Sequence, residues 1–170
     1  FHEVKEIALL ERPLESDGTL YFIPPARMAR ITRAPGETTL VIDGARMSYR
    51  DTGGGNSVDL SANRVARAIV ENFVVLFNGD LGALSERYRV EFGADGARWH
   101  MRLVPKGPPV SQLIASIELR GDGPALREMR VLEKEGDRTT TLFHDVVVDT
   151  RFSREELGRI FLEGPPAKTP

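Results

Sequence analysis

A chain of 170 residues with 41% hydrophobic and 28% charged side chains has the composition of one globular domain, long enough to bury a core. Its net charge of −2 gives no overall attraction to nucleic acid or anionic lipid head groups, and the absence of cysteine excludes disulfides and thiolate metal sites. The longest apolar run is Phe73 to Phe77, so we expect no segment that stays inserted in a membrane.

Strand patterns dominate the first sixty residues. We expect a turn at Pro13–Gly18 and a hairpin around Asp43-Gly44, which lies between two apolar runs. The glycines of Thr52–Asn56 predict a flexible loop rather than a phosphate cradle, because no helix or lysine follows at once. The expected strands are Phe1–Leu10, Leu20–Ile23, Met28–Arg33, Leu40–Ile42 and Arg46–Tyr49.

One amphipathic helix is predicted over Ser61–Asn78, with Ser61 as its N-cap and Gly79 as its C-terminal stop. Asp80 can cap a short second helix, Leu81–Glu86. Apolar residues at spacings of three and four form one stripe, which we expect to lie against a sheet. The stripe consists of Val65, Ala66, Ile69, Phe73, Leu76 and Phe77.

Strands resume after these helices. In the stretch RWHMRLVP, residues 98–105, Trp99, Met101 and Leu103 alternate with polar side chains, so we expect the apolar set to face inwards and the polar set to face water. One helical turn is expected within Pro108–Ala115, and a C-terminal helix opens at Ser153–Leu157. The expected strands are Tyr88–Phe92, Arg98–Val104, Ser116–Arg120, Leu126–Glu135 and Arg138–Val148.

The number of elements has a consequence for the sheet. Nine or ten hairpin-connected strands form a sheet that curls, whereas one helix with its side chains is only about 10–12 Å across. Such a helix cannot cover the whole concave face, so part of this face is expected to be an open groove. The four methionines all fall on predicted strands, where they suit either an adaptable binding surface or a plain core.

Catalytic and metal-binding patterns are weak. The three histidines, His2, His100 and His144, have no ligand spacing, and His144 and Asp149 would point to opposite faces of a strand. There is no G-x-S-x-G nucleophile elbow. We therefore expect a protein that is not an enzyme and that needs no metal, nucleotide or other cofactor.

Four stretches share their order and spacing with a known family. They are GTLYFIPPARMARIT (18–32), LVIDGARMSYRD (40–51), LFNGDLGALSERYRVEF (76–92) and TTTLFHDVVVDTRFSREEL (139–157). The chain resembles the LolA-like periplasmic carriers of outer-membrane lipoproteins. This resemblance implies an α+β fold, in which a curved antiparallel half-barrel has helices plugging its concave face and an acyl-chain pocket between them.

The resemblance also implies boundaries. Residues 1–163 are expected to form a single domain, followed by a flexible tail at 164–170. The family begins with a helix before its first strand, so we expect such a helix upstream of Phe1. In known members an arginine precedes the proline after the second strand and bonds to the plugging helices. Pro24 stands at the matching position, which leaves Arg27 or Arg30 as candidates for this contact.

The function implied by the resemblance is a monomeric carrier in the periplasm, exported by a signal peptide that is then removed. It would shield the acyl chains of lipoproteins, or of another lipid, between an inner-membrane donor and an outer-membrane acceptor. The alternative is a sensor of lipids or lipoproteins on the same fold. Strand alternation and the family's pocket position predict the lining of the cavity. It consists of Leu20, Phe22, Met28, Leu40, Ile42, Met47, Tyr49, Phe73, Phe77, Trp99, Met101, Ile117 and Met129.

Overall fold

The computed structural model describes residues 1–163, so the expected tail at 164–170 lies outside the described residues. The described strands are β1 His2–Glu6, β2 Leu14–Ile23, β3 Arg27–Ala34, β4 Thr38–Asp43, β5 Arg46–Asp51, β6 Gly54–Asp59, β7 Tyr88–Asp95, β8 Arg98–Pro105, β9 Ile114–Asp122, β10 Ala125–Glu133 and β11 Arg138–Leu142. The helices are α1 Arg64–Asn78, α2 Leu81–Arg87, α3 Val110–Leu113, α4 Arg154–Gly158 and the π-helical η1 Arg159–Glu163.

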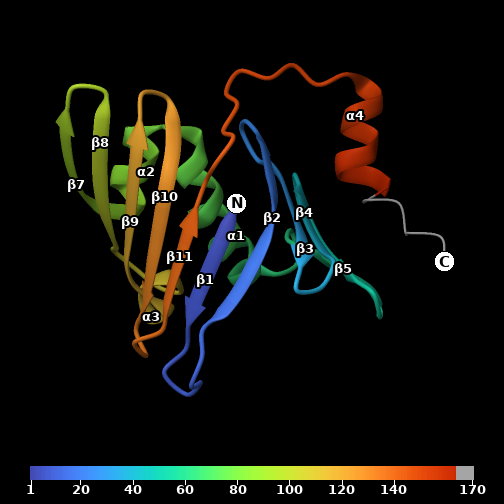
Figure 1. The fold of residues 1–170 in the computed structure, drawn as a ribbon, viewed down its shortest axis with the longest axis horizontal. Helices are drawn as coiled ribbons and strands as arrows, with labels where there is room; N and C mark the ends of the chain where they lie inside the picture. Colours follow the sequence, from blue (N-terminus) through green and yellow to red (C-terminus); the bar gives the residue numbers. More distant parts are fainter. Residues whose placement is uncertain (164–170) are drawn as a thin grey trace.

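The strands form one antiparallel sheet in the order β6-β5-β4-β3-β2-β1-β11-β10-β9-β8-β7 (Figure 1). The first strand pairs with β2 on one side and with β11 on the other, so it joins an N-terminal half, β2 to β6, to a C-terminal half, β7 to β11. The sheet curves but does not close, since β6 and β7 remain its two edges. The expected α+β half-barrel is confirmed.

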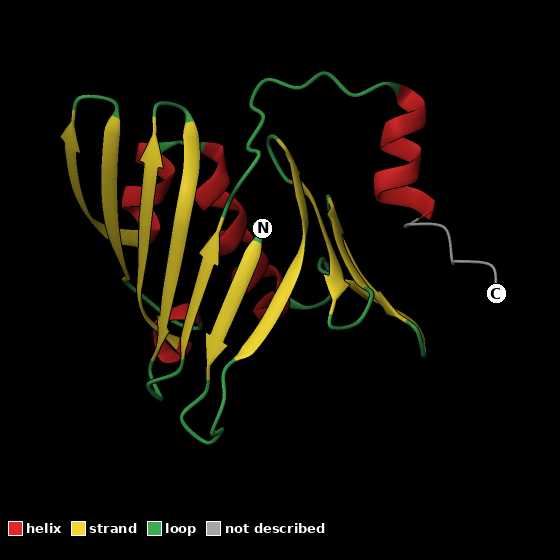
Figure 2. Cartoon of the chain, viewed as in Figure 1, coloured by secondary structure: helices red, strands yellow, loops and turns green. Residues whose placement is uncertain are grey.

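Helices lie on both faces of this sheet (Figure 2). Helices α1 and α2 pack against the face that carries Met101 and Leu103, which we call the inner face. The segment α4–η1 lies against the opposite, outer face, where Phe161 packs on Ala29 and Val41. Directly paired residues of antiparallel strands share a face, so the strand registers assign every sheet residue to one of these faces.

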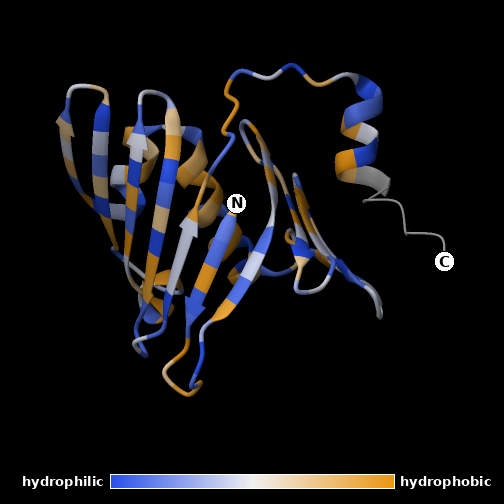
Figure 3. Cartoon of the chain, in the orientation of Figure 1, coloured by the Kyte–Doolittle hydropathy of each residue, from blue (hydrophilic) through white to orange (hydrophobic). Residues whose placement is uncertain are grey.

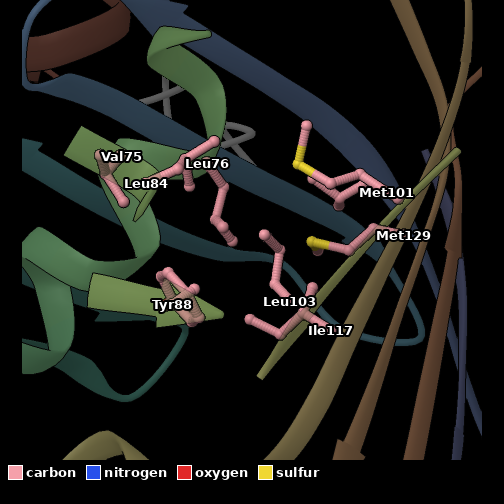
Figure 4. Close-up of a cluster of buried hydrophobic side chains, with 9 residues drawn as sticks. Val75, Leu76, Leu84, Tyr88, Met101, Leu103, Ile117 and Met129 are labelled. Atoms are coloured by element: carbon pink, nitrogen blue, oxygen red, sulfur yellow. The ribbon is translucent and has the colours of Figure 1, made fainter. Parts of the chain in front are cut away.

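The inner face of the C-terminal half carries the main core (Figure 4). Leu76 of α1 and Leu84 of α2 point at strand side chains in a buried cluster of nine residues. The cluster consists of Val75, Leu76, Leu84, Tyr88, Met101, Leu103, Ile117, Leu119 and Met129. The Tyr88 hydroxyl donates a hydrogen bond of 3.0 Å to the carbonyl of Asn72 in α1, and burial raises the pKa of Tyr88 to about 12.

Hydropathy alternates along the strands of this half (Figure 3). Met101 and Leu103 are buried and Trp99 is half-buried, whereas the intervening Arg98, His100 and Arg102 are exposed. The orientation predicted for residues 98–105 is therefore confirmed. Among the described residues, no helix combines the length and the apolar character needed to cross a membrane.

Several element boundaries differ from those predicted. Pro13–Gly18 is not a turn, because Leu14 onwards is the first half of β2 and pairs with β1; the chain turns earlier, where Leu10 N–H donates to the Ile7 carbonyl. The glycine-rich loop also contains an edge strand, β6, which pairs with β5. The last strand ends at Leu142 rather than Val148, and an extended connection leads from it to α4.

The caps of the helices are partly as expected. Asn63, not Ser61, caps α1 by accepting a hydrogen bond from Ala66 N–H, because the Ser61 hydroxyl instead donates to Asp59. Gly79 ends α1 in the left-handed conformation, with φ of +68°, and Asp80 caps α2, both as predicted.

The predicted stripe of α1 is covered only over its C-terminal turns. Leu76 is buried and Phe73 and Phe77 pack against the core, but Val65 and Ile69 are 59% and 39% exposed. The expectation that the whole stripe lies against the sheet is therefore wrong. The buried cluster reaches only the end of α1 that leads into α2, and it takes in Val75 there.

Candidate functional site

The inner face of the N-terminal half presents two rows of mainly apolar side chains. Each row crosses β2, β3, β4 and β5, because paired residues of neighbouring strands lie beside each other. The first row consists of Leu20, Arg30, Leu40 and Tyr49, and the second of Phe22, Met28, Ile42 and Met47.

The C-terminal end of α1 contacts the second row at Phe22. The ring of Phe77 lies 5.5 Å from that of Phe22 and 5.9 Å from that of Phe73. Next to it, the Asn78 side chain donates a hydrogen bond of 2.9 Å to the carbonyl of Pro25, in the turn after β2. Aromatic contact and hydrogen bond together hold the end of α1 to the N-terminal half of the sheet.

The structure brings the predicted lining residues to one side of the sheet. The strand registers place the strand members on the inner face, and the two helical members lie on the stripe of α1. Their burial, however, divides them. Met101, Ile117 and Met129 are built into the main core, and Trp99 packs against it with its indole N–H donating to the Gly123 carbonyl at 2.9 Å.

In the N-terminal half the same face is covered less completely. Met28 and Ile42 are buried, but Leu20, Phe22, Leu40 and Met47 are only half-buried and Tyr49 is 45% exposed. On a helix, residues four apart share a face, so the exposed Val65 and Ile69 continue the stripe that ends at Phe73 and Phe77. An incompletely covered apolar surface thus runs from the inner face of β2 to β5 along α1.

A polar cluster lies on the inner face where the two halves meet. Arg30 Nη2 lies 2.8 Å from Glu3 Oε1, and the Thr141 hydroxyl donates to Glu3 Oε2 at 2.9 Å. The Arg30 guanidinium also lies over the Phe1 ring, 4.5 Å from its centroid. The prediction of the lining missed this cluster, although the alternation of β3 does place Arg30 on the same face as Met28.

The two arginines considered for the helix contact have different positions. Arg27 donates to Asp43 at 2.9 Å and lies over the ring of Phe161, so it supports the C-terminal segment on the outer face. Arg30 donates to Glu3 and Ser16, which are strand residues. The hydrogen bond from α1 to the turn after β2 is instead made by Asn78, a contact that the sequence analysis did not identify.

Two open depressions lie elsewhere on the surface. One of about 700 Å³ is formed by β7, β8 and β9, and one of about 780 Å³ lies between β4, β5 and β6 and Phe161. Neither is lined by residues of α1; of the predicted lining residues, Trp99 and Met101 border the first depression and Tyr49 borders the second. Within the described part of the chain, no three histidine, aspartate or glutamate side chains are grouped as a metal site.

Comparison with known proteins places the chain in a family. A family model described as "Outer membrane lipoprotein carrier protein LolA-like" matches residues 1–154. The match spans all the described strands and α1 to α3, and it ends where α4 begins. No curated protein matches the chain.

Proposed function

Since the chain belongs to the LolA-like family of outer membrane lipoprotein carriers, we propose that it binds acyl chains of lipoproteins or of another lipid and shields them from water on the inner face of its half-barrel. Members of this family act in the periplasm and carry lipid-modified cargo rather than convert it. We propose the same setting for this chain, with a donor at the inner membrane and an acceptor at the outer membrane.

The observation that supports the proposal is the unequal covering of the inner face. The C-terminal half is covered by α1 and α2, whereas half-buried apolar side chains remain on β2 to β5, and the apolar stripe of α1 includes exposed residues. We propose that this surface is the acyl site and that Met101, Ile117 and Met129 serve as core. The proposed site consists of Leu20, Phe22, Leu40, Met47, Tyr49, Phe73 and Phe77.

The energetics suit a carrier. Each buried methylene contributes about 0.8 kcal/mol, so a chain of about a dozen methylenes gains about 10 kcal/mol before the cost of ordering is subtracted. Met47 is flexible and can adapt to chains of different shape. Binding of this kind depends on buried area rather than on bonds, so it is reversible when an acceptor offers a larger apolar surface.

The test has two parts. Native mass spectrometry of protein purified from its own host should show co-purified lipid, and a diacyl lipopeptide should raise the melting temperature because it binds the folded state. The replacement Tyr49→Ser should reduce this increase. The matched replacement Phe92→Ser, at an exposed aromatic residue of the distant strand β7, should leave it unchanged. No co-purified lipid, together with no shift for lipopeptides or fatty acyl esters, would exclude the carrier function.

A further inference from the structure

A charged pair interrupts the apolar inner face between the two halves of the sheet. Arg30 extends from β3 across β2 to Glu3 of β1, at 2.8 Å, and Glu3 is held in turn by Thr141 of β11, at 2.9 Å. The two charged side chains are only 32% and 18% exposed. Well-packed apolar residues often stabilise such a position as well as or better than a partly desolvated ion pair, so stability alone does not explain this one.

The Arg30 side chain keeps unused hydrogen-bonding capacity. Among the described residues its hydrogen bonds come from Nη2 alone, which serves Glu3 and, at 3.4 Å, the hydroxyl of Ser16. The donors on Nη1 and Nε remain, because a guanidinium carries five N–H groups. The central carbon of the guanidinium lies over the Phe1 ring, 4.5 Å from its centroid. Leu20 and Leu40 flank Arg30 in the same row of the proposed acyl site.

The charges of Arg30 and Glu3 determine which kind of hydrogen-bond acceptor on a ligand can bind to Arg30. Arg30 is already neutralised by Glu3, so a further carboxylate at Arg30 would lie close to the Glu3 carboxylate and be repelled by it. An uncharged carbonyl oxygen accepts from Nη1 or Nε without this repulsion. We propose, on the basis of the function proposed above, that Arg30 binds the ester or amide carbonyl of an acylated cargo. The site therefore takes acyl esters and amides in preference to free fatty acids.

The experiment compares monolauroylglycerol with laurate, both below their micelle concentrations and at mildly alkaline pH, by isothermal titration calorimetry. The wild-type protein should bind the ester about tenfold more tightly or better, a difference typical of one hydrogen bond to a charged group. Arg30→Met should reduce ester affinity by about the same factor. Glu3→Gln removes the charge that repels a carboxylate. It should therefore increase the affinity for laurate and reduce or reverse the preference for the ester over laurate.

Two further variants separate this role from a structural one. Arg33→Met removes a neighbouring arginine of β3 that bonds to Thr19 at 2.9 Å, and it should change neither affinity. Arg30→Lys keeps a positive charge beside Glu3 and three N–H donors on one nitrogen, so it should retain part of the ester affinity that Arg30→Met loses. Melting curves show which variants are folded.

The outcomes distinguish the two proposals. Equal wild-type affinity for ester and laurate, or an ester affinity that is unchanged in folded Arg30→Met, would overturn the role of Arg30 and leave the carrier function intact. Failure of the wild type to bind either probe or a lipopeptide would overturn the carrier function, and this inference with it.

Discussion

Truncating one side chain in each half of the inner face should separate core from site. Leu103 is fully buried in the main cluster, so Leu103→Ala should cost about 3–4 kcal/mol, within the range for buried leucines. Met47 is only half-buried, so Met47→Ala should cost about 1–2 kcal/mol, because part of its surface is already in water. For a chain of this size the first change lowers the melting temperature by about 6–16 °C and the second by about 2–8 °C.

The assay combines urea unfolding with a lipid titration. Urea unfolding gives the free energy of unfolding, and a fatty acyl ester should raise the melting temperature of each variant through binding to the folded state. Leu103→Ala should keep the wild-type increase despite its lower starting temperature. Met47→Ala should lose part of the increase despite its small effect on stability.

The reverse pattern would refute this division of the inner face. If the ester-induced increase vanished in Leu103→Ala and persisted in Met47→Ala, the acyl site would lie in the C-terminal half. A large loss of stability in Met47→Ala, with binding unchanged, would make the N-terminal half ordinary core.

Phe73→Ala should lower the free energy of unfolding by about 2–3 kcal/mol and also weaken acyl binding, because Phe73 packs against the core with part of its ring uncovered. Urea unfolding and a lipid titration of the same variant check this. Intact binding would assign Phe73 to the core alone. Gly121→Ala should destabilise the fold by about 2 kcal/mol or more and shift Trp99 emission to the red, because the added methyl group would overlap the indole ring; an unchanged emission spectrum would contradict this. Hydrogen bonds from the Ser153 backbone and side chain hold the pKa of Glu156 below its ordinary value of 4.5. The ionised Glu156 therefore stabilises α4 fully above pH 4.5, and this stabilisation is lost as the pH falls through the lowered pKa. An NMR titration should show this low pKa in the wild type and a partial return towards 4.5 in Ser153→Ala, which loses the side-chain hydrogen bond but keeps the one from the backbone. An ordinary pKa in the wild type would refute the capping argument.

Local patterns predicted the parts of this fold that local interactions determine. The alternation of Trp99, Met101 and Leu103 gave the correct faces, because successive side chains of a strand must point to opposite sides. The Asp43-Gly44 hairpin was correct for a similar reason, since Gly44 has a φ of +59° that glycine adopts without strain. Both features depend only on neighbouring residues.

Boundaries set by partner strands could not be predicted in this way. Leu14 to Gly18 is polar and turn-like in composition, yet it is strand because β1 supplies partners for its backbone. Val146 to Val148 is β-branched, yet it is not strand: Leu142, the last residue of β11, is also the last to pair, with His2 and Glu128. In both cases backbone pairing outweighs the local propensity of the side chains.

The division of the inner face into a covered and an incompletely covered half also could not be predicted from the sequence. Alternation can assign Leu40 and Ile117 to one face, but it cannot say which of them a helix covers. That depends on where α1 lies, and α1 is held by its C-terminal end through the Asn78 contact and the core around Leu76. Arg30 illustrates the same limit, because its partner Glu3 lies on β1, two strands away in the sheet.

The link between α1 and the turn after β2 is made without the arginine that the family resemblance led us to expect at the position of Pro24. A proline has no N–H and no charged side chain to offer a helix, but the Pro25 carbonyl remains an acceptor, and Asn78 donates to it from the helix side. An exposed hydrogen bond of this kind contributes only about 0.5–1.5 kcal/mol. Together with the contact between the rings of Phe22 and Phe77, this hydrogen bond stabilises the position of α1 over β2 by less free energy than the burial of an acyl chain contributes. Val75 and Leu76 hold α1 in the main core on the C-terminal half, so this weaker contact with β2 can open for a cargo chain while the half-barrel stays intact.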